Sequence, residues 1–159
     1  MIVPVSFRIS ALPLDSFAPL FELSDAELTA RGMRRITAES KPGYPCRVSL
    51  VDAEVGERVL LLPYPHLPGP SPYAASGPVF AREAAREANL GVNEVPESIR
   101  TRLLSVRGYD REGIMVGSDV TEGRSLEGTV SRLFSDERVD YLHLHNARAG
   151  CYSCRVDRA

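Results

Sequence analysis

Tyr141–Asp157, YLHLHNARAGCYSCRVD, is the segment on which the interpretation of the chain depends. It holds two of the three histidines and two of the three cysteines. Successive side chains of a β-strand point to opposite faces, so Leu142 and Leu144 share one face while His143 and His145 share the other. We expect two short strands joined by a tight loop, with the leucines in a core. The histidine face is then exposed, lines a cleft or meets a second buried layer, and any chemistry is expected there.

The register of this hairpin decides which thiol meets which imidazole. A loop of five residues, 146–150, places His145 opposite Cys151 and His143 opposite Ser153. A loop of four residues pairs His145 with Tyr152 and His143 with Cys154. Both registers are compatible with the sequence.

Size and composition are those of an ordinary globular protein. The chain has 159 residues, 43% hydrophobic and 25% charged, with a formal charge of -2, so one domain over residues 1–159 is expected. The near-neutral charge argues against a nucleic-acid partner, and no apolar run reaches the roughly 20 residues that span a bilayer. The N-terminus lacks the pattern of a signal peptide, and the three cysteines are an odd number, which favours a reducing cytoplasm. The oligomeric state is left open.

The patterns along the chain predict an α+β fold, a mostly antiparallel sheet with two or three short helices. Ser24 and Glu27 form a capping-box pattern before a helix that ends near Gly32. Ser125 is expected to cap a second helix, whose apolar stripe is Leu126, Val130, Leu133 and Phe134. The strands are expected at Val5–Ser10, Met33–Ala38, Cys46–Leu50, Arg58–Leu62, Val79–Ala81, Leu103–Tyr109, Ile114–Ser118 and in the two halves of the C-terminal stretch.

Pro63–Pro78 carries six of the twelve prolines, together with His66, Tyr73 and Ser76. Such a stretch is not expected inside a sheet, because proline cannot donate to the ladder. We expect an ordered loop, and a loop of this length is either a functional segment or a plain surface crossover.

The histidines and cysteines suggest two kinds of chemistry. The candidate catalytic residues, for a Cys–His or Ser–His nucleophile or a general acid or base, are Cys46, His66, His143, His145 and Cys151. A zinc site at Cys151, Cys154 and His145 is the alternative, but it needs a turn between the two cysteines, because residues three apart on a strand point to opposite faces. We favour reduced thiols packed as small apolar groups and expect no metal and no cofactor.

A third pattern is a set of side chains suited to an anionic small molecule. Arginine forks on strands and tight loops bind carboxylates and phosphates, and hydroxyl and amide groups can complete such a pocket. The candidate ligand-binding residues are Arg47, Tyr73, Ser76, Asn146, Arg148 and Arg155, and Arg107 belongs to the same arginine set. Ordinary ion pairing is the competing explanation.

Four segments carry a resemblance to a known family. They are FRIS near the start, KPGYPCRVSLVDAEVGE at Lys41–Glu57, SPYAASGPVF at Ser71–Phe80 and HLHNARAGCYSCRVDR at His143–Arg158. Together, and in this order, they resemble the bacterial family catalogued as domain of unknown function 1203. The resemblance implies a small single-domain bacterial protein, and it implies no activity and no catalytic residues.

The sequence supports two hypotheses about function. The first is a small-molecule enzyme or ligand-binding protein, whose Cys/His-lined cleft lies under the proline-rich segment and is formed by Cys46, His66, Tyr73, His143, His145 and Arg148. The second is a non-catalytic interaction module that docks a partner through residues 63–78. The first requires His66 to meet His143 or His145 in one pocket.

Overall fold

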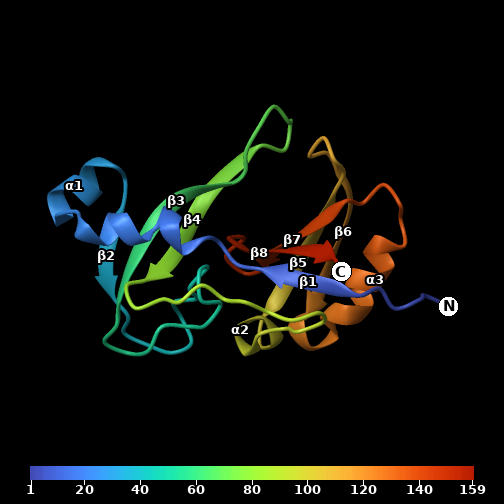
Figure 1. The fold of residues 1–159 in the computed structure, drawn as a ribbon, viewed down its shortest axis with the longest axis horizontal. Helices are drawn as coiled ribbons and strands as arrows, with labels where there is room; N and C mark the ends of the chain where they lie inside the picture. Colours follow the sequence, from blue (N-terminus) through green and yellow to red (C-terminus); the bar gives the residue numbers. More distant parts are fainter.

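Two antiparallel sheets make up the computed structural model, which describes residues 1–159. The five-stranded sheet has the order β1-β8-β7-β5-β6 and the three-stranded sheet the order β2-β3-β4. With a few short helices beside them, the sheets confirm the predicted α+β class. Figure 1 shows the sheets side by side, with α1 and β2 at one end and α3 at the other. None of the helices has the length and apolar character needed to cross a membrane.

The five-stranded sheet is formed by β1 (Phe7–Ser10), β5 (Leu103–Tyr109), β6 (Met115–Glu122), β7 (Tyr141–Asn146) and β8 (Tyr152–Arg158). The short helix α2 (Glu97–Arg100) precedes β5. A 3-10 turn (Gly123–Ser125) leads from β6 into α3 (Leu126–Phe134).

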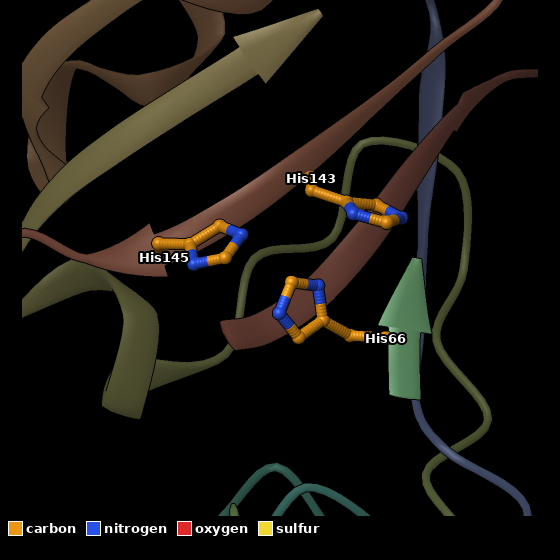
Figure 2. Close-up of side chains that lie close together, drawn as sticks. All are labelled: His66, His143 and His145. Carbon is orange, nitrogen blue, oxygen red and sulfur yellow. The ribbon is translucent and has the colours of Figure 1, made fainter. Parts of the chain in front are cut away.

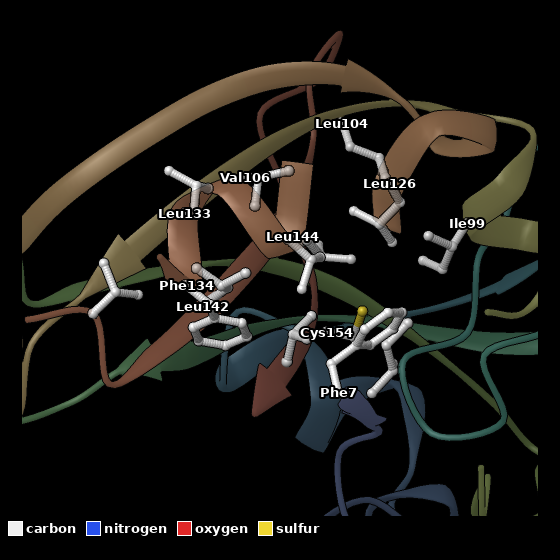
Figure 3. Close-up of a cluster of buried hydrophobic side chains, with 14 of the residues drawn as sticks. Phe7, Ile99, Leu104, Val106, Leu126, Leu133, Phe134, Leu142, Leu144 and Cys154 are labelled. Atoms are coloured by element: carbon white, nitrogen blue, oxygen red, sulfur yellow. The ribbon is translucent and has the colours of Figure 1, made fainter. Parts of the chain in front are cut away.

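The larger core lies between α3 and one face of this sheet. All four residues of the predicted stripe on α3 are buried, and they share one cluster with Leu142 and Leu144 of β7. Figure 3 shows these side chains converging, with the sulfur of Cys154 among them. The expected inward direction of the two leucines is therefore confirmed.

The three-stranded sheet is formed by β2 (Arg34–Thr37), β3 (Arg58–Leu67) and β4 (Ala75–Arg82). Two 3-10 turns (Leu14–Ser16 and Ala18–Glu22) and α1 (Asp25–Ala30) supply Phe17 and Leu28 to a second core with Leu60 and Val79. The predicted capping box is present, because Glu27 N donates to Ser24 Oγ and Ser24 N donates to the Glu27 carboxylate. Tyr152 of β8 belongs to this second core, so it joins the two sheets.

The proline-rich segment is a β-hairpin, which corrects the expectation of a loop. β3 and β4 pair from Val59 with Arg82 to Leu67 with Ala75, and Pro63 lies opposite Pro78. β2 pairs only with residues 58–61 of β3. Beyond residue 61, β3 has β4 as its one neighbour and its other edge is unpaired. A proline whose nitrogen faces this unpaired edge removes no hydrogen bond from the sheet. Only residues 68–74 connect the two strands.

Two other local predictions were wrong. Residues 46–50 form turns rather than a strand, because Leu50 N donates to the Cys46 carbonyl and Leu50 has a left-handed φ of 54°. The apolar residues Cys46, Val48 and Leu50 alternate with Arg47 and Ser49 in sequence as in a strand, but Arg47 is buried as well. Ser125 makes no capping bond, because it belongs to the 3-10 turn that leads into α3. The strands expected at Leu103–Tyr109 and Ile114–Ser118 are present as β5 and β6, which pair as an antiparallel hairpin.

The register of β7 and β8 matches neither of the two expected alternatives. His145 lies opposite Tyr152, as a four-residue loop requires, but His143 lies opposite Arg155 rather than Cys154. The register shifts between Leu144 and His145, so β8 carries one extra residue as in a β-bulge. The bulge brings both Tyr152 and Arg155 to the face that carries the histidines.

Candidate metal centre

The three histidines of the chain meet between the two sheets. His143 and His145 project from the face of β7 that lies opposite the α3 core, and His66 projects from β3. The ring centroid of His66 lies 5.1 Å from that of His145 and 6.1 Å from that of His143. Figure 2 shows each ring turning one nitrogen toward the space shared by all three. We name these three residues the histidine cluster.

Each ring has one buried nitrogen without a hydrogen-bond partner. These atoms are His66 Nδ1, His143 Nδ1 and His145 Nε2. One nitrogen from each ring can be chosen so that all three lie within 4.8 Å of one another. Leaving a polar atom buried and unpaired costs about 1–3 kcal/mol, so three in one place call for a ligand or a compensating group.

The orientation of His145 is fixed by the loop that follows it. His145 Nδ1 lies 2.9 Å from the carbonyl oxygen of Gly150, and only a protonated Nδ1 can donate to that oxygen. The lone pair of the neutral ring is then on Nε2, the buried nitrogen without a partner. A histidine that ligates a metal is typically held in this way, by a carbonyl on its other nitrogen.

The rings are kept neutral by their surroundings. Burial, followed by the neighbouring histidines and arginines, lowers the pKa of His143 to about 3. Burial likewise lowers the pKa of His145 to about 4, against the opposing effect of the Gly150 carbonyl. Burial and Arg107 lower the pKa of His66 as well. Neutral imidazoles keep the lone pairs that metal ions bind.

The charged side chains that shift the pKa values of the histidine cluster are arginines. Arg107 lies opposite His143 on β5, makes no ion pair, and contributes to the lowered pKa of all three histidines. Its Nε donates to Ser105 Oγ at 3.2 Å. Arg155 acts on His143, and no carboxylate acts on any of the three rings. The arginines therefore favour an anionic ligand beside a metal ion bound by the histidine cluster.

Aromatic side chains complete the walls. Tyr152 stacks on His66 with centroids 5.2 Å apart and planes at 5°, and it meets His143 edge-on at 5.0 Å. Tyr109 and Tyr141 pack against the other side of His143, at 5.3 and 5.2 Å. The rings of His66 and His143 are thus held by packing, while the ring of His145 is also held by its contact with the Gly150 carbonyl.

The spacing of the nitrogens is slightly wider than a bound ion needs. A zinc ion with Zn–N bonds of about 2.1 Å holds two nitrogens at most about 4.2 Å apart. The histidine nitrogens, which lie within 4.8 Å of one another, would therefore have to move closer together around a bound ion. Three imidazoles on one ion leave at least one coordination position for water or substrate, as in catalytic zinc sites.

The comparison with protein families decides the identity of the chain. The family described as "Protein of unknown function (DUF1203)" matches residues 43–158. The chain belongs to this family. The matched segment contains the whole histidine cluster, and it confirms the resemblance that the sequence motifs suggested. Comparisons with curated proteins and with solved structures found no match.

The cysteines of this DUF1203 protein lie away from the histidine cluster. Cys154 faces the α3 core, where complete burial raises its pKa to about 12, so it and His145 point to opposite sides of the sheet. The zinc set of Cys151, Cys154 and His145 is therefore excluded by geometry. Cys46 is buried in the second core, where its sulfur accepts from the backbone of Ser49 and Arg82.

The predicted ligand-binding residues divide into two groups. Arg47, Asn146 and Arg148 line one cavity together with Cys151. The others are elsewhere: Tyr73 is exposed near Tyr109, Ser76 is exposed on β4, and Arg155 is held by Asp157 above the ring of Tyr141. The cleft formed by Cys46, His66, Tyr73, His143, His145 and Arg148 is therefore not present as one site.

The proline-rich hairpin contributes His66, on β3, to the histidine cluster rather than forming a separate lid. Its six prolines are exposed, and Tyr73 is 41% exposed. A role for this hairpin in binding a protein partner stays a prediction.

Two contributors, Tyr152 and Arg107, were not among the residues that the sequence assigned to the cleft. Tyr152 faces the histidines as in the four-residue register, while the bulge in β8, which nothing in the local sequence marks, brings Arg155 rather than Cys154 opposite His143. Arg107 was named among the arginines, and its alternation with the buried Val106 on a predicted strand indicates its face. The missing step was the pairing of β5 with β7, which a single sequence does not provide.

Proposed function

We propose that this DUF1203 protein binds a divalent transition metal ion, with zinc as the representative, through His66, His143 and His145. We further propose that the ion acts on a small molecule at its open coordination position. The observation that supports the proposal is the convergence of three buried imidazole nitrogens that have no other partner.

The donor set favours some metals over others. Imidazole suits zinc, copper, iron and nickel, whereas magnesium and calcium prefer carboxylate and carbonyl oxygens. No carboxylate acts on the rings, so the histidine cluster fits the first group. The sequence expectation of no metal was based on the cysteines, which this proposal does not use.

Two features support a reactive rather than a purely structural ion. Structural zinc is almost always bound by four protein ligands, while catalytic zinc has three and a water. Zinc lowers the pKa of its bound water to about 7, which supplies hydroxide at neutral pH. Arg107, free of any ion pair, is placed to attract an anionic substrate.

Metal analysis tests the proposal directly. Protein purified without added metal, and without a histidine tag, is analysed by mass spectrometry for transition metals. The chelated protein is then titrated with Co²⁺ while visible absorption is followed. We expect one ion per chain and the d–d bands of a low-coordinate site. His143→Ala should lose both signals, while Tyr152→Phe, which keeps the stacked ring, should retain them.

Two results would refute the proposed metal site. If wild-type protein carries no stoichiometric metal and excess Co²⁺ produces no d–d bands, the proposal is wrong. Equal Co²⁺ spectra for wild type and His143→Ala would also refute it, because binding would then lie elsewhere.

A further inference from the structure

A cavity is lined in part by the loop that connects β7 and β8. It has a volume of about 490 Å³, and its lining includes Arg47, Arg102, Asn146, Arg148 and Cys151. None of these residues belongs to the histidine cluster, so this is a separate candidate site.

Arg47 brings a buried positive charge to this cavity. It is 1% exposed, and its guanidinium makes no ion pair. Nε donates to the Tyr152 carbonyl at 2.7 Å, Nη1 donates to the Pro45 carbonyl, and Nη2 donates to Cys151 Sγ at 3.2 Å. Two of the five N–H groups of a guanidinium are thus left over. A buried charge is costly unless it is paired, so an anion in the cavity would be stabilised.

The other lining residues agree with this charge. Arg148 is exposed at the mouth of the cavity and makes no ion pair, while Arg102 is held by Asp52 at 2.8 Å. Glu122 is the only carboxylate in the lining. The cavity therefore has an excess of positive charge.

Asn146 contacts the thiol in this lining. Its Nδ2 donates to Cys151 Sγ at 3.5 Å, so the amide and Arg47 both meet the same sulfur.

We propose that this cavity binds a small organic acid, whose carboxylate lies against Arg47 and Arg148 and beside the thiol of Cys151. The thiol lies in the lining with both Arg47 and Asn146 on its sulfur. It is the only partly exposed cysteine, since Cys46 and Cys154 are 1% and 0% exposed.

The native cysteine permits a direct test with two alkylating agents of similar size. Iodoacetate carries a carboxylate and iodoacetamide is its neutral analogue. In both reactions Sγ attacks the methylene carbon, iodide leaves with the bonding electron pair, and the thiol proton passes to solvent. The rate constant at Cys151 is measured for each reagent by peptide mass spectrometry, in folded protein and in urea-unfolded protein, where the cavity is absent.

We expect the ratio of the iodoacetate rate to the iodoacetamide rate to be about tenfold higher in folded than in unfolded protein, equivalent to about 1.4 kcal/mol. Arg148→Ala should lower the folded ratio severalfold. Arg31→Ala, which removes another exposed arginine without an ion pair, at the C-cap of α1, should leave it unchanged.

Three results would overturn the inference: equal ratios in folded and unfolded protein, no effect of Arg148→Ala, or no reaction of Cys151 in the folded protein. The last would show that the cavity does not admit a small acid. Cys151→Ser confirms the assignment of the labelled peptide.

Discussion

At the level of single residues, the sequence placed two of the three members of the histidine cluster on one face. Alternation along β7 correctly placed His143 and His145 opposite the leucines, because period two is a property of any strand. His66 was a candidate, but its position depends on the pairing of β3 with β4, which the prolines concealed. The direction of a side chain on a strand can be predicted from its immediate neighbours in sequence. The contact between the two sheets depends on residues far apart in sequence.

The first prediction concerns the pH dependence of the metal-free protein. The pKa of His143 is lowered to about 3 and that of His145 to about 4 from an ordinary value of 6.5. Below pH 6.5 the unfolded chain therefore binds protons that the folded chain does not, so the free energy of unfolding falls as pH falls toward these values. At pH 5 the loss is about 2 kcal/mol for each of these histidines.

Urea unfolding in the presence of a chelator, at pH 7 and pH 5, measures this loss. His143→Gln removes one of the two titrating rings and should reduce the difference between the two pH values by about 2 kcal/mol. An identical pH difference in wild type and variant would contradict the assigned environment of His143.

At the level of helices and strands, helices were easier to predict than the boundaries of strands. The stripe on α3 and the capping box of α1 are encoded within a few residues, and both are present. Residues 46–50 and 63–78 were misread because burial and proline content are ambiguous without the neighbouring chain. A proline-rich segment can be a strand wherever its open edge needs no donor.

Two glycines at the start of α3 provide the second prediction. A Cβ at Gly123 would lie 1.9 Å from the Ile99 carbonyl oxygen and 2.8 Å from that of Arg100. A Cβ at Gly128, inside α3, would meet nothing within 4 Å. Gly123→Ala should therefore destabilise the protein by about 3 kcal/mol, and Gly128→Ala should stabilise it by about 1 kcal/mol.

Replacement of glycine by alanine is thus expected to lower the free energy of unfolding at position 123 and to raise it at position 128. Urea unfolding of the two variants measures both effects at pH 7. Similar stability of Gly123→Ala and wild type would show that the 3-10 turn does not approach α2 as closely as described.

In the molecule as a whole, the histidine cluster connects the two sheets. His66 belongs to the three-stranded sheet, and the other two rings belong to the five-stranded sheet. A metal ion bound there would link them, and binding energy for the folded state alone appears as stability.

The third prediction is a thermal shift. With zinc at a thousand times its dissociation constant, stabilisation is about 4 kcal/mol, or roughly 8–16 °C for a chain of this size. Calorimetry with and without zinc measures the shift. His66→Ala should abolish it, because two histidines on one strand no longer connect the sheets. A shift retained in full by this variant would place the stabilising ion elsewhere.

The order of the strands also constrains how the protein is made. β2, β3 and β4 are close in sequence and can pair early, whereas β7 lies between β5 and β8, and β1 pairs only with β8. During synthesis, β1 therefore stays unpaired until β8 has left the ribosome. Until then the apolar residues of β1, Phe7 and Ile9, lack their final neighbours, so chaperones have most to protect at that stage.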